Sequence, residues 1–241
     1  MQLRENIQRV QAKIAAAASA AGRSPEEITL CAATKVQSDD TIRQAISDGI
    51  TVCGENRVQE LTAHLAADAY SGAKEVHFIG HLQTNKVKQV VGKVDLIQSV
   101  DSLHLLQAIH NQADKLGIVQ AILFEVNIGG EESKSGCAPE LLPQLVQEVG
   151  NMPHVRLRGL MAIPPISSYP GANRRYFARM HQLFIDITQE MSDNQGVMDC
   201  LSMGMSADYE DAIAEGATLV RVGTALFGPR PPYGPPLNAC R

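Results

Sequence analysis

Ile28-Thr29-Leu30-Cys31-Ala32-Ala33-Thr34-Lys35 is a run of small and apolar residues that ends in a lysine, and polar residues follow from Gln37 onward. In a β-strand alternate side chains share a face, so Lys35 stands above Cys31 and Ala33 on one side of the expected strand. Burial of an unpaired ammonium loses several kcal/mol of hydration and lowers the lysine pKa, which frees the amine to attack a carbonyl carbon. Taken alone, the run favours a strand-end lysine whose stem reaches water, but the segments that follow favour a reactive amine.

Strand-like and helical patterns alternate along the rest of the chain. The expected strands are 28–35, 51–56, 76–80, 95–101, 119–128, 155–163, 198–203 and 219–222. The expected helices between them are 39–48, 57–69, 84–91, 102–116, 139–149, 174–191 and 207–215. Mostly apolar strands that alternate with helices predict an α/β fold with a parallel sheet covered on its outer side. Eight such units in 241 residues predict a single (β/α)8 TIM barrel. A doubly wound open sheet is the alternative, although no G-x-G-x-x-G follows the first strand.

Two segments flank the expected barrel. At the amino end Glu5, Arg9 and Lys13 recur opposite an apolar stripe, which predicts an extra N-terminal amphipathic helix over 2–21 rather than a targeting peptide. At the carboxyl end, proline and glycine are too frequent for any regular element. The sequence therefore predicts one domain over 1–228 and a Pro/Gly-rich C-terminal tail over 229–241.

The amino-acid composition indicates which partners and which cellular compartment to expect. A formal charge of −5 gives no basic field for nucleic acid or an anionic membrane surface, and no apolar run approaches the ~18 residues of a membrane span. The cysteines are odd in number, five in all, and form no C-x-x-C pair. Reduced core cysteines of a cytoplasmic protein are therefore expected, in preference to disulfides.

The residues that close the strands point to a cofactor. In a barrel of this kind the active site lies at the carboxyl ends of the strands, where Lys35 closes the first strand and Asn56 the second. The loops after the seventh and eighth strands, 202–206 and 223–224, carry glycines and hydroxyls and lie where barrels often bind phosphate. A reactive amine across the mouth from a phosphate site predicts pyridoxal 5′-phosphate, a phosphorylated aldehyde. Arg221 would donate to the ring nitrogen, keep it unprotonated and weaken the ring as an electron sink.

Five segments together carry a family resemblance. They are Ala32-Ala33-Thr34-Lys35, Gly54-Glu55-Asn56-Arg57-Val58-Gln59-Glu60, His77-Phe78-Ile79-Gly80-His81-Leu82-Gln83-Thr84-Asn85-Lys86, Ser202-Met203-Gly204-Met205-Ser206-Ala207-Asp208 and Arg221-Val222-Gly223-Thr224-Ala225-Leu226-Phe227-Gly228. From about residue 3 to residue 228 the chain resembles the pyridoxal phosphate homeostasis protein family, whose fold is similar to the barrel domain of alanine racemase.

The resemblance implies roles for single residues. It implies that Lys35 carries the cofactor as a Schiff base and that Arg221 meets the ring nitrogen. It places Asn56 beside the cofactor, and it assigns the phosphate to Ser202, Gly223 and Thr224. It implies no metal, and it implies pyridoxal 5′-phosphate and enzymes that depend on it as partners. Arg57 stands where the family often has an aromatic residue.

Other polar residues have simpler interpretations. His77 and His81 are expected as a surface and a mouth-lining histidine rather than a metal pair, because no acidic residue stands beside them at ligand spacing. The glycine-rich stretch 129–136 lacks the G-x-x-x-x-G-K-[ST] pattern and is expected to form a loop over the mouth.

Three functions remain after these steps. The leading hypothesis is a protein of intracellular vitamin B6 homeostasis that holds the cofactor reversibly without strong catalysis. The alternatives are an amino-acid racemase that uses the same cofactor and an aldolase that uses the lysine alone. Two-base racemisation in the related alanine racemases draws its second proton donor from a β-domain after the barrel, and the sequence leads us to expect no such domain here.

Overall fold

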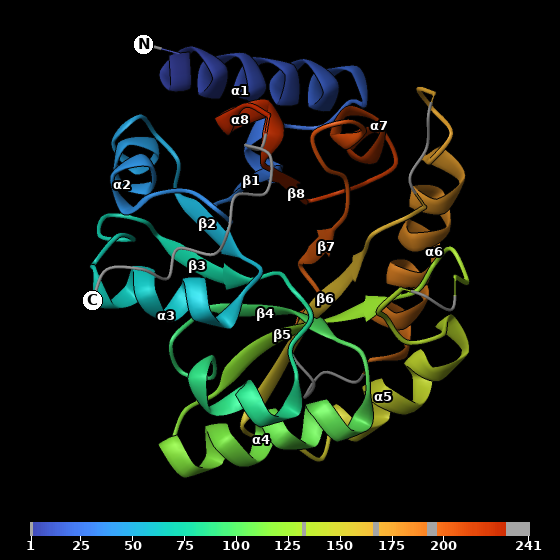
Figure 1. The fold of residues 1–241 in the computed structure, drawn as a ribbon. Helices are drawn as coiled ribbons and strands as arrows, with labels where there is room; N and C mark the ends of the chain where they lie inside the picture. The colour runs from blue at the N-terminus through green and yellow to red at the C-terminus, as the bar shows by residue number, and fades with distance from the viewer. Residues whose placement is uncertain (1, 132–133, 166–168, 192–196, 230–241) are drawn as a thin grey trace.

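The computed structural model describes residues 2–131, 134–165, 169–191 and 197–229 and contains a closed barrel of eight parallel strands (Figure 1). The strands are β1 (Thr29–Ala33), β2 (Val52–Glu55), β3 (Glu75–Phe78), β4 (Leu96–Val100), β5 (Gln120–Val126), β6 (Val155–Ala162), β7 (Cys200–Ser202) and β8 (Leu219–Val222). The α-helices are α1 (Gln2–Ala20), α2 (Asp39–Ser47), α3 (Val58–Ala66), α4 (Leu103–Leu116), α5 (Leu142–Val149), α6 (Arg174–Glu190), α7 (Tyr209–Ala214) and α8 (Thr224–Phe227). The predicted (β/α)8 barrel with an extra N-terminal helix is confirmed.

Strand pairing follows chain order, and β1 closes the ring by pairing with both β2 and β8. In that register Cys31 lies opposite Val52 on one side and Arg221 on the other. Because all strands run in the same direction, their carboxyl ends meet at one end of the barrel. The residues that close β8, β1 and β2 are therefore neighbours at that end.

Alternating side chains divide the sheet between two cores. Buried side chains on the outer face pack with the helices, and Ala32 belongs to this set. A smaller apolar cluster fills the barrel, made of Cys31, Val52, Leu96, Ala121, Leu123, Met161, Cys200 and Leu219. Cys31 and Ala32 thus face opposite ways, as the period of two predicts. Lys35 lies four positions after the inward-facing Cys31, so the same alternation places it on the inward side.

The amphipathic helix α1 lies across one side of the barrel beside α7 and α8 (Figure 1). Its buried stripe is Ile7, Val10, Ile14 and Ala18. The side-chain amide of Asn6 donates to the carbonyl of Leu226 at 2.8 Å, and Lys13 pairs with Glu210 at 2.9 Å. Helix α1 therefore attaches to the segments that follow the last two strands.

Several boundaries differ from the sequence prediction. The stretch predicted as a helix over 84–91 forms a 3₁₀ helix at Thr84–Gln89, and α8 was not predicted. Short segments of this kind hold too few turns for a hydrophobic period to be read. The four described cysteines are free and buried, as expected, while Cys240 and the predicted tail from residue 230 onward lie outside the described residues. None of the described helices combines the length and apolar character that a bilayer span needs.

Candidate functional site

The predicted site residues lie on neighbouring strands at the carboxyl end of the barrel. Lys35 follows β1 by two residues, Asn56 directly follows β2, and Gly223 and Thr224 directly follow β8. Since β8, β1 and β2 are adjacent in the ring, these residues share one sector of the mouth. Lys35 and Asn56 are half-buried and Thr224 is exposed, so this sector is open to solvent.

Lys35 lies in a tight turn that the sequence pattern did not reveal. The carbonyl of Thr34 accepts a hydrogen bond from the N–H of Gln37 at 3.0 Å, and Val36 has a φ of 58°. A left-handed conformation costs a residue with a Cβ about 1–2 kcal/mol. The N–H of Val36 donates to Oε2 of Glu60 at 2.8 Å, which ties the turn to α3. The lysine is therefore presented on a strained but anchored backbone.

Asn56 carries a buried amide oxygen that lacks a partner among the described groups. Its backbone N–H donates to Oε1 of Glu55 at 2.8 Å, but Oδ1 accepts no hydrogen bond. A Cβ on Gly80 would stand 2.1 Å from the carbonyl oxygen of Asn56, so only glycine allows the two loops to pass this closely. An unsatisfied buried acceptor costs about 1–3 kcal/mol, which marks Oδ1 as a position for a ligand donor.

A hydroxyl and two backbone amides meet between the loops after β7 and β8. The N–H groups of Gly223 and Ala225 both donate to Oγ of Ser206 at 3.2 Å. Gly204 turns this loop with a φ of 90°, and a Cβ there would stand 2.6 Å from the Cβ of Ala212. The sequence pattern alone assigns no role to Ser206, because its contact with these amides depends on how the two loops pack together.

Ser202 lies in a different place from Ser206. It is fully buried at the end of β7, where its hydroxyl donates to Oε1 of Gln98 at 2.7 Å and accepts a hydrogen bond from Nη1 of Arg221. Nη2 of Arg221 donates to the carbonyl of Ala162 at 2.9 Å. The structure therefore brings Ser202 together with Arg221 below the mouth, while Gly223 and Thr224 stand at its rim.

A chain of hydrogen bonds runs from Arg221 through the barrel interior, and we call it the polar chain. After Ser202 and Gln98 it continues from Nε2 of Gln98 to Nδ1 of His77 at 2.9 Å, and from Nε2 of His77 to Glu75 at 2.7 Å. Glu75 is the first residue of β3, at the amino end of the barrel. The hydrogen bond from His77 holds the pKa of Glu75 below its ordinary value. The polar chain thus joins the two ends of the barrel.

His77 corrects one expectation. It was predicted to lie at the surface, but it is 1% exposed and faces the barrel interior, whereas His81 is exposed. His77 can lie in the interior because the side-chain amide of Gln98 on β4 donates a hydrogen bond to its Nδ1 there. Local sequence could not reveal this contact between two neighbouring strands.

Two ionisable groups stand at the inner end of the site. Arg221 is 4% exposed, and burial lowers its pKa, yet a guanidinium stays charged at neutral pH. Burial raises the pKa of Glu125 to about 7, although the Arg221 charge lowers it and the Asp101 charge raises it further. Glu125 is therefore a group at the barrel mouth that titrates near neutral pH.

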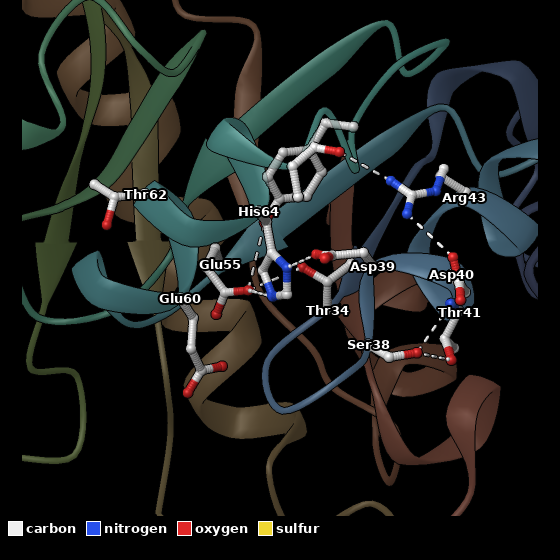
Figure 2. A network of polar contacts seen from close by, with 12 residues as sticks. Thr34, Ser38, Asp39, Asp40, Thr41, Arg43, Glu55, Glu60, Thr62 and His64 are labelled. Atoms are coloured by element: carbon white, nitrogen blue, oxygen red, sulfur yellow. Dashed lines mark hydrogen bonds and ion pairs between the residues drawn. The ribbon is translucent and has the colours of Figure 1, made fainter. Parts of the chain in front are cut away.

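A buried polar cluster lies behind the lysine turn, between β2 and the helices α2 and α3 (Figure 2). Glu55 is fully buried and accepts from the hydroxyl of Thr34 at 3.2 Å. Nδ1 of His64 lies 2.5 Å from Asp39, and Nε2 lies 3.9 Å from Glu55. Burial raises the pKa of the Glu55 carboxyl. This cluster supports the backbone that carries Lys35 and Asn56.

Arg57 lies at the rim, outside this cluster. It is exposed at the start of α3, and its guanidinium donates to Oε1 of Glu60 at 3.2 Å. The charge of Arg57 is thus paired with the glutamate that anchors the lysine turn.

A cavity of about 600 Å³ lies at the opposite, amino-terminal end of the barrel. Its lining includes the strand starts and α1, and its polar residues include Glu75, His77, Arg158 and Asp199. None of the predicted site residues lines it. The cavity contacts the far end of the polar chain, but the lysine and the loop amides lie at the other end.

The chain is similar to known proteins over nearly its whole length. The family model described as alanine racemase, N-terminal domain, matches residues 2–231. A pyridoxal phosphate homeostasis protein of Aquifex aeolicus (strain VF5) is 43% identical over 230 residues, which cover 94% of this chain and 97% of that protein.

Solved structures agree with this relationship. PipY of Synechococcus elongatus PCC7942, described with PLP bound, superposes with a TM-score of 0.79 at 32% identity over 94% of this chain and 100% of that chain. Alanine racemase of Clostridium difficile 630 superposes with a TM-score of 0.72 at 16% identity, over 96% of this chain and 57% of that one. The second likeness concerns the fold alone.

We predict that replacement of Gln98 breaks the polar chain. Gln98→Leu keeps the approximate size of the side chain but leaves the Ser202 hydroxyl without its acceptor and Nδ1 of His77 without its donor, at about 1–3 kcal/mol for each unsatisfied group. Urea unfolding should show this loss, while Gln107→Leu on the exposed face of α4 should stay within about 0.5 kcal/mol of the wild type. Equal stability of the two variants would show that the polar chain contributes nothing.

The raised pKa of Glu125 predicts a pH dependence of stability. Its folded pKa of about 7 exceeds the ordinary value of 4.5, so the folded state binds the extra proton between these two values. The free energy of unfolding should therefore fall as pH rises through this window, by about 3 kcal/mol in all, and stay level above it.

Urea unfolding of the wild type and Glu125→Gln at pH 5 and pH 8 measures this effect. The variant should lose less stability than the wild type between the two pH values, because it has no proton to release. Glu140→Gln, at an exposed position, serves as the control and should follow the wild type. Parallel pH profiles for Glu125→Gln and the wild type would contradict the prediction.

Proposed function

The chain belongs to the family of pyridoxal phosphate homeostasis proteins, and from this premise we propose that it binds pyridoxal 5′-phosphate at the carboxyl end of its barrel. It holds the cofactor as part of intracellular vitamin B6 homeostasis. One observation carries the proposal: the adjacent strands β8, β1 and β2 are followed by Gly223, Lys35 and Asn56, so loop amides, an amine and an unpaired amide oxygen share one sector of the mouth.

The residues present fit the chemical groups of this cofactor. Lys35 would hold the aldehyde carbon covalently through its amine, with the aldehyde oxygen leaving as water. Gly223 and Thr224 hold the phosphate, and Ser206, which already accepts from two loop amides, stands at the same position. Asn56 contacts the cofactor through its unpaired Oδ1, and a direct contact between Ser202 and the phosphate stays a prediction. The proposed cofactor domain spans residues 1–228.

The position of Arg221 explains why strong catalysis is not part of the proposal. The cofactor assists proton removal from a bound amino acid when its ring nitrogen is protonated, because the ring then withdraws electrons. We assign Arg221 to that nitrogen. A guanidinium donates hydrogen bonds and cannot give up its proton, so it keeps the nitrogen unprotonated. Ser202 and Ala162 hold the guanidinium in this role.

The proposal also concerns the partners of the protein and its location in the cell. Reversible holding implies exchange of the cofactor with enzymes that depend on it, and these enzymes are the proposed partners. The four described cysteines are buried thiols rather than disulfides, which supports the proposed cytoplasmic location. A racemase is the second candidate function, supported by the match of residues 2–231 to the family model for the alanine racemase N-terminal domain.

Replacement of Lys35 tests the covalent link. Purified protein loaded with pyridoxal 5′-phosphate should show a visible absorption band that borohydride bleaches, with the added mass on the Lys35 peptide. Lys35→Ala should lose the visible band, and borohydride treatment should leave at least tenfold less added mass on it. Its far-ultraviolet circular dichroism should stay unchanged, because the Lys35 side chain lies at an open strand end. Lys115→Ala at an exposed position of α4 is the control. Added mass on another lysine in the wild type would refute the assignment.

The racemase alternative is tested with the loaded protein. We expect incubation with L-alanine and other L-amino acids to give D-isomers far more slowly than about 1 per second, the lower range of ordinary enzymes. The physical reason is the unprotonated ring nitrogen held by Arg221. Chiral chromatography measures the product. Turnover at enzyme rates that Lys35→Ala abolishes would replace the homeostasis proposal with the racemase.

A further inference from the structure

Glu55, Glu60 and His64 bring three candidate ligand atoms together behind the lysine turn (Figure 2). One oxygen of each carboxylate and one ring nitrogen of His64 all lie within 4.8 Å of one another. Glu55 ends β2, while Glu60 and His64 stand four residues apart on α3 and so share one helix face. We propose that these three side chains bind a divalent transition-metal ion of the zinc class, a site outside the cofactor pocket.

His64 is already oriented as a metal ligand. Its Nδ1 lies 2.5 Å from Oδ1 of Asp39, and a carboxylate in that place accepts a hydrogen bond from Nδ1–H. The tautomer that this bond favours leaves a lone pair on Nε2. The same carboxylate–histidine arrangement supports histidine ligands in many metal sites.

Nε2 of His64 is buried and lacks a hydrogen-bond partner among the described residues. The residue is only 8% exposed, and Nε2 faces Oε2 of Glu55 at 3.9 Å. This distance is too long for a hydrogen bond. A nitrogen lone pair and an ionised carboxylate oxygen that face each other in a buried place repel, and a cation between them would remove this repulsion.

The distance suits a metal ion between the two atoms. Bonds from zinc to histidine nitrogen and to carboxylate oxygen are about 2.0–2.2 Å, so tetrahedral ligand atoms lie about 3.4 Å apart. The two atoms need to approach by only about half an ångström from 3.9 Å. Two carboxylates would balance the charge of a divalent ion. The ion would in turn offset the free-energy cost of burying the Glu55 carboxylate without a counter-charge.

Glu60 completes the site and provides access to it. Its side chain is 22% exposed, whereas Glu55 is fully buried, so an ion can enter from the Glu60 side. Glu60 is held in place by the N–H of Val36 and by Arg57. A carboxylate has about four lone-pair sites, so these two bonds leave capacity for a metal. Because Val36 adjoins Lys35, a bound ion would also brace the lysine turn.

The donor set favours one class of ion. One imidazole nitrogen and two carboxylate oxygens suit zinc and its neighbours, whereas magnesium prefers oxygen ligands alone and keeps most of its waters. Three protein ligands leave a fourth position for water.

Metal titration of the full-length protein tests the inference. Chelator-treated protein is titrated with zinc by calorimetry and with cobalt(II) by visible absorption. The wild type should bind one ion per chain, show the intense visible absorption of four-coordinate cobalt, and unfold at a higher temperature with zinc. A wild type that binds no ion with this stoichiometry would overturn the proposal.

Variants assign the ligands. His64→Ala should weaken binding at least 100-fold, Glu60→Gln at least tenfold, and Asp39→Asn about 10–100-fold through the histidine. His104→Ala, an exposed histidine of α4, should bind as the wild type does. Glu60 is partly exposed, so Glu60→Gln should fold even if a change at buried His64 disturbs the core. Wild-type affinity in both Glu60→Gln and His64→Ala would place the ion elsewhere and refute the site.

Discussion

A charged guanidinium inside the barrel is the constraint on which much of this structure depends. Burial of an unpaired charge costs several kcal/mol, so Arg221 requires partners on the strands around it. It finds them in the Ser202 hydroxyl, the carbonyl of Ala162 and, at longer range, the Glu125 carboxyl. Strands β5 and β7 therefore place polar side chains among the apolar ones of the barrel interior, and β6 supplies a backbone carbonyl.

The donor character of Arg221 sets the direction of every bond in the polar chain. A guanidinium only donates, so the Ser202 hydroxyl accepts from it and must give its own proton to Oε1 of Gln98. The amide of Gln98 then donates to Nδ1 of His77, which leaves the proton of His77 on Nε2 for Glu75. The chain thus starts on a cation and ends on a carboxylate, and aligned bonds of this kind strengthen one another.

The barrel was predictable because the alternation of strand and helix patterns is repeated eight times along the chain. An error at the boundary of one element leaves this alternation intact. Positions that depend on contacts between strands were not predictable in the same way. His77 was misplaced because its partner Gln98 lies on the next strand, 21 positions along the chain. Ser202 and Ser206 are only four positions apart, at the end of β7 and in the loop after it, and only the fold shows that the first faces Arg221 and the second faces the loop amides. The partners of Glu55 and His64 likewise required the packing of α3 on β2.

The polar chain also bears on why a protein with this barrel would hold a cofactor rather than exploit it. If Arg221 meets the ring nitrogen as we propose, one side chain serves both the core and the cofactor. A neutral or acidic residue that allowed a protonated ring would leave Ser202 and the carbonyl of Ala162 without their donor. Each buried group left unpaired costs about 1–3 kcal/mol, so a gain in catalysis would be opposed by a loss of stability. Under this proposal, weak catalysis would be a consequence of how the barrel interior is held together.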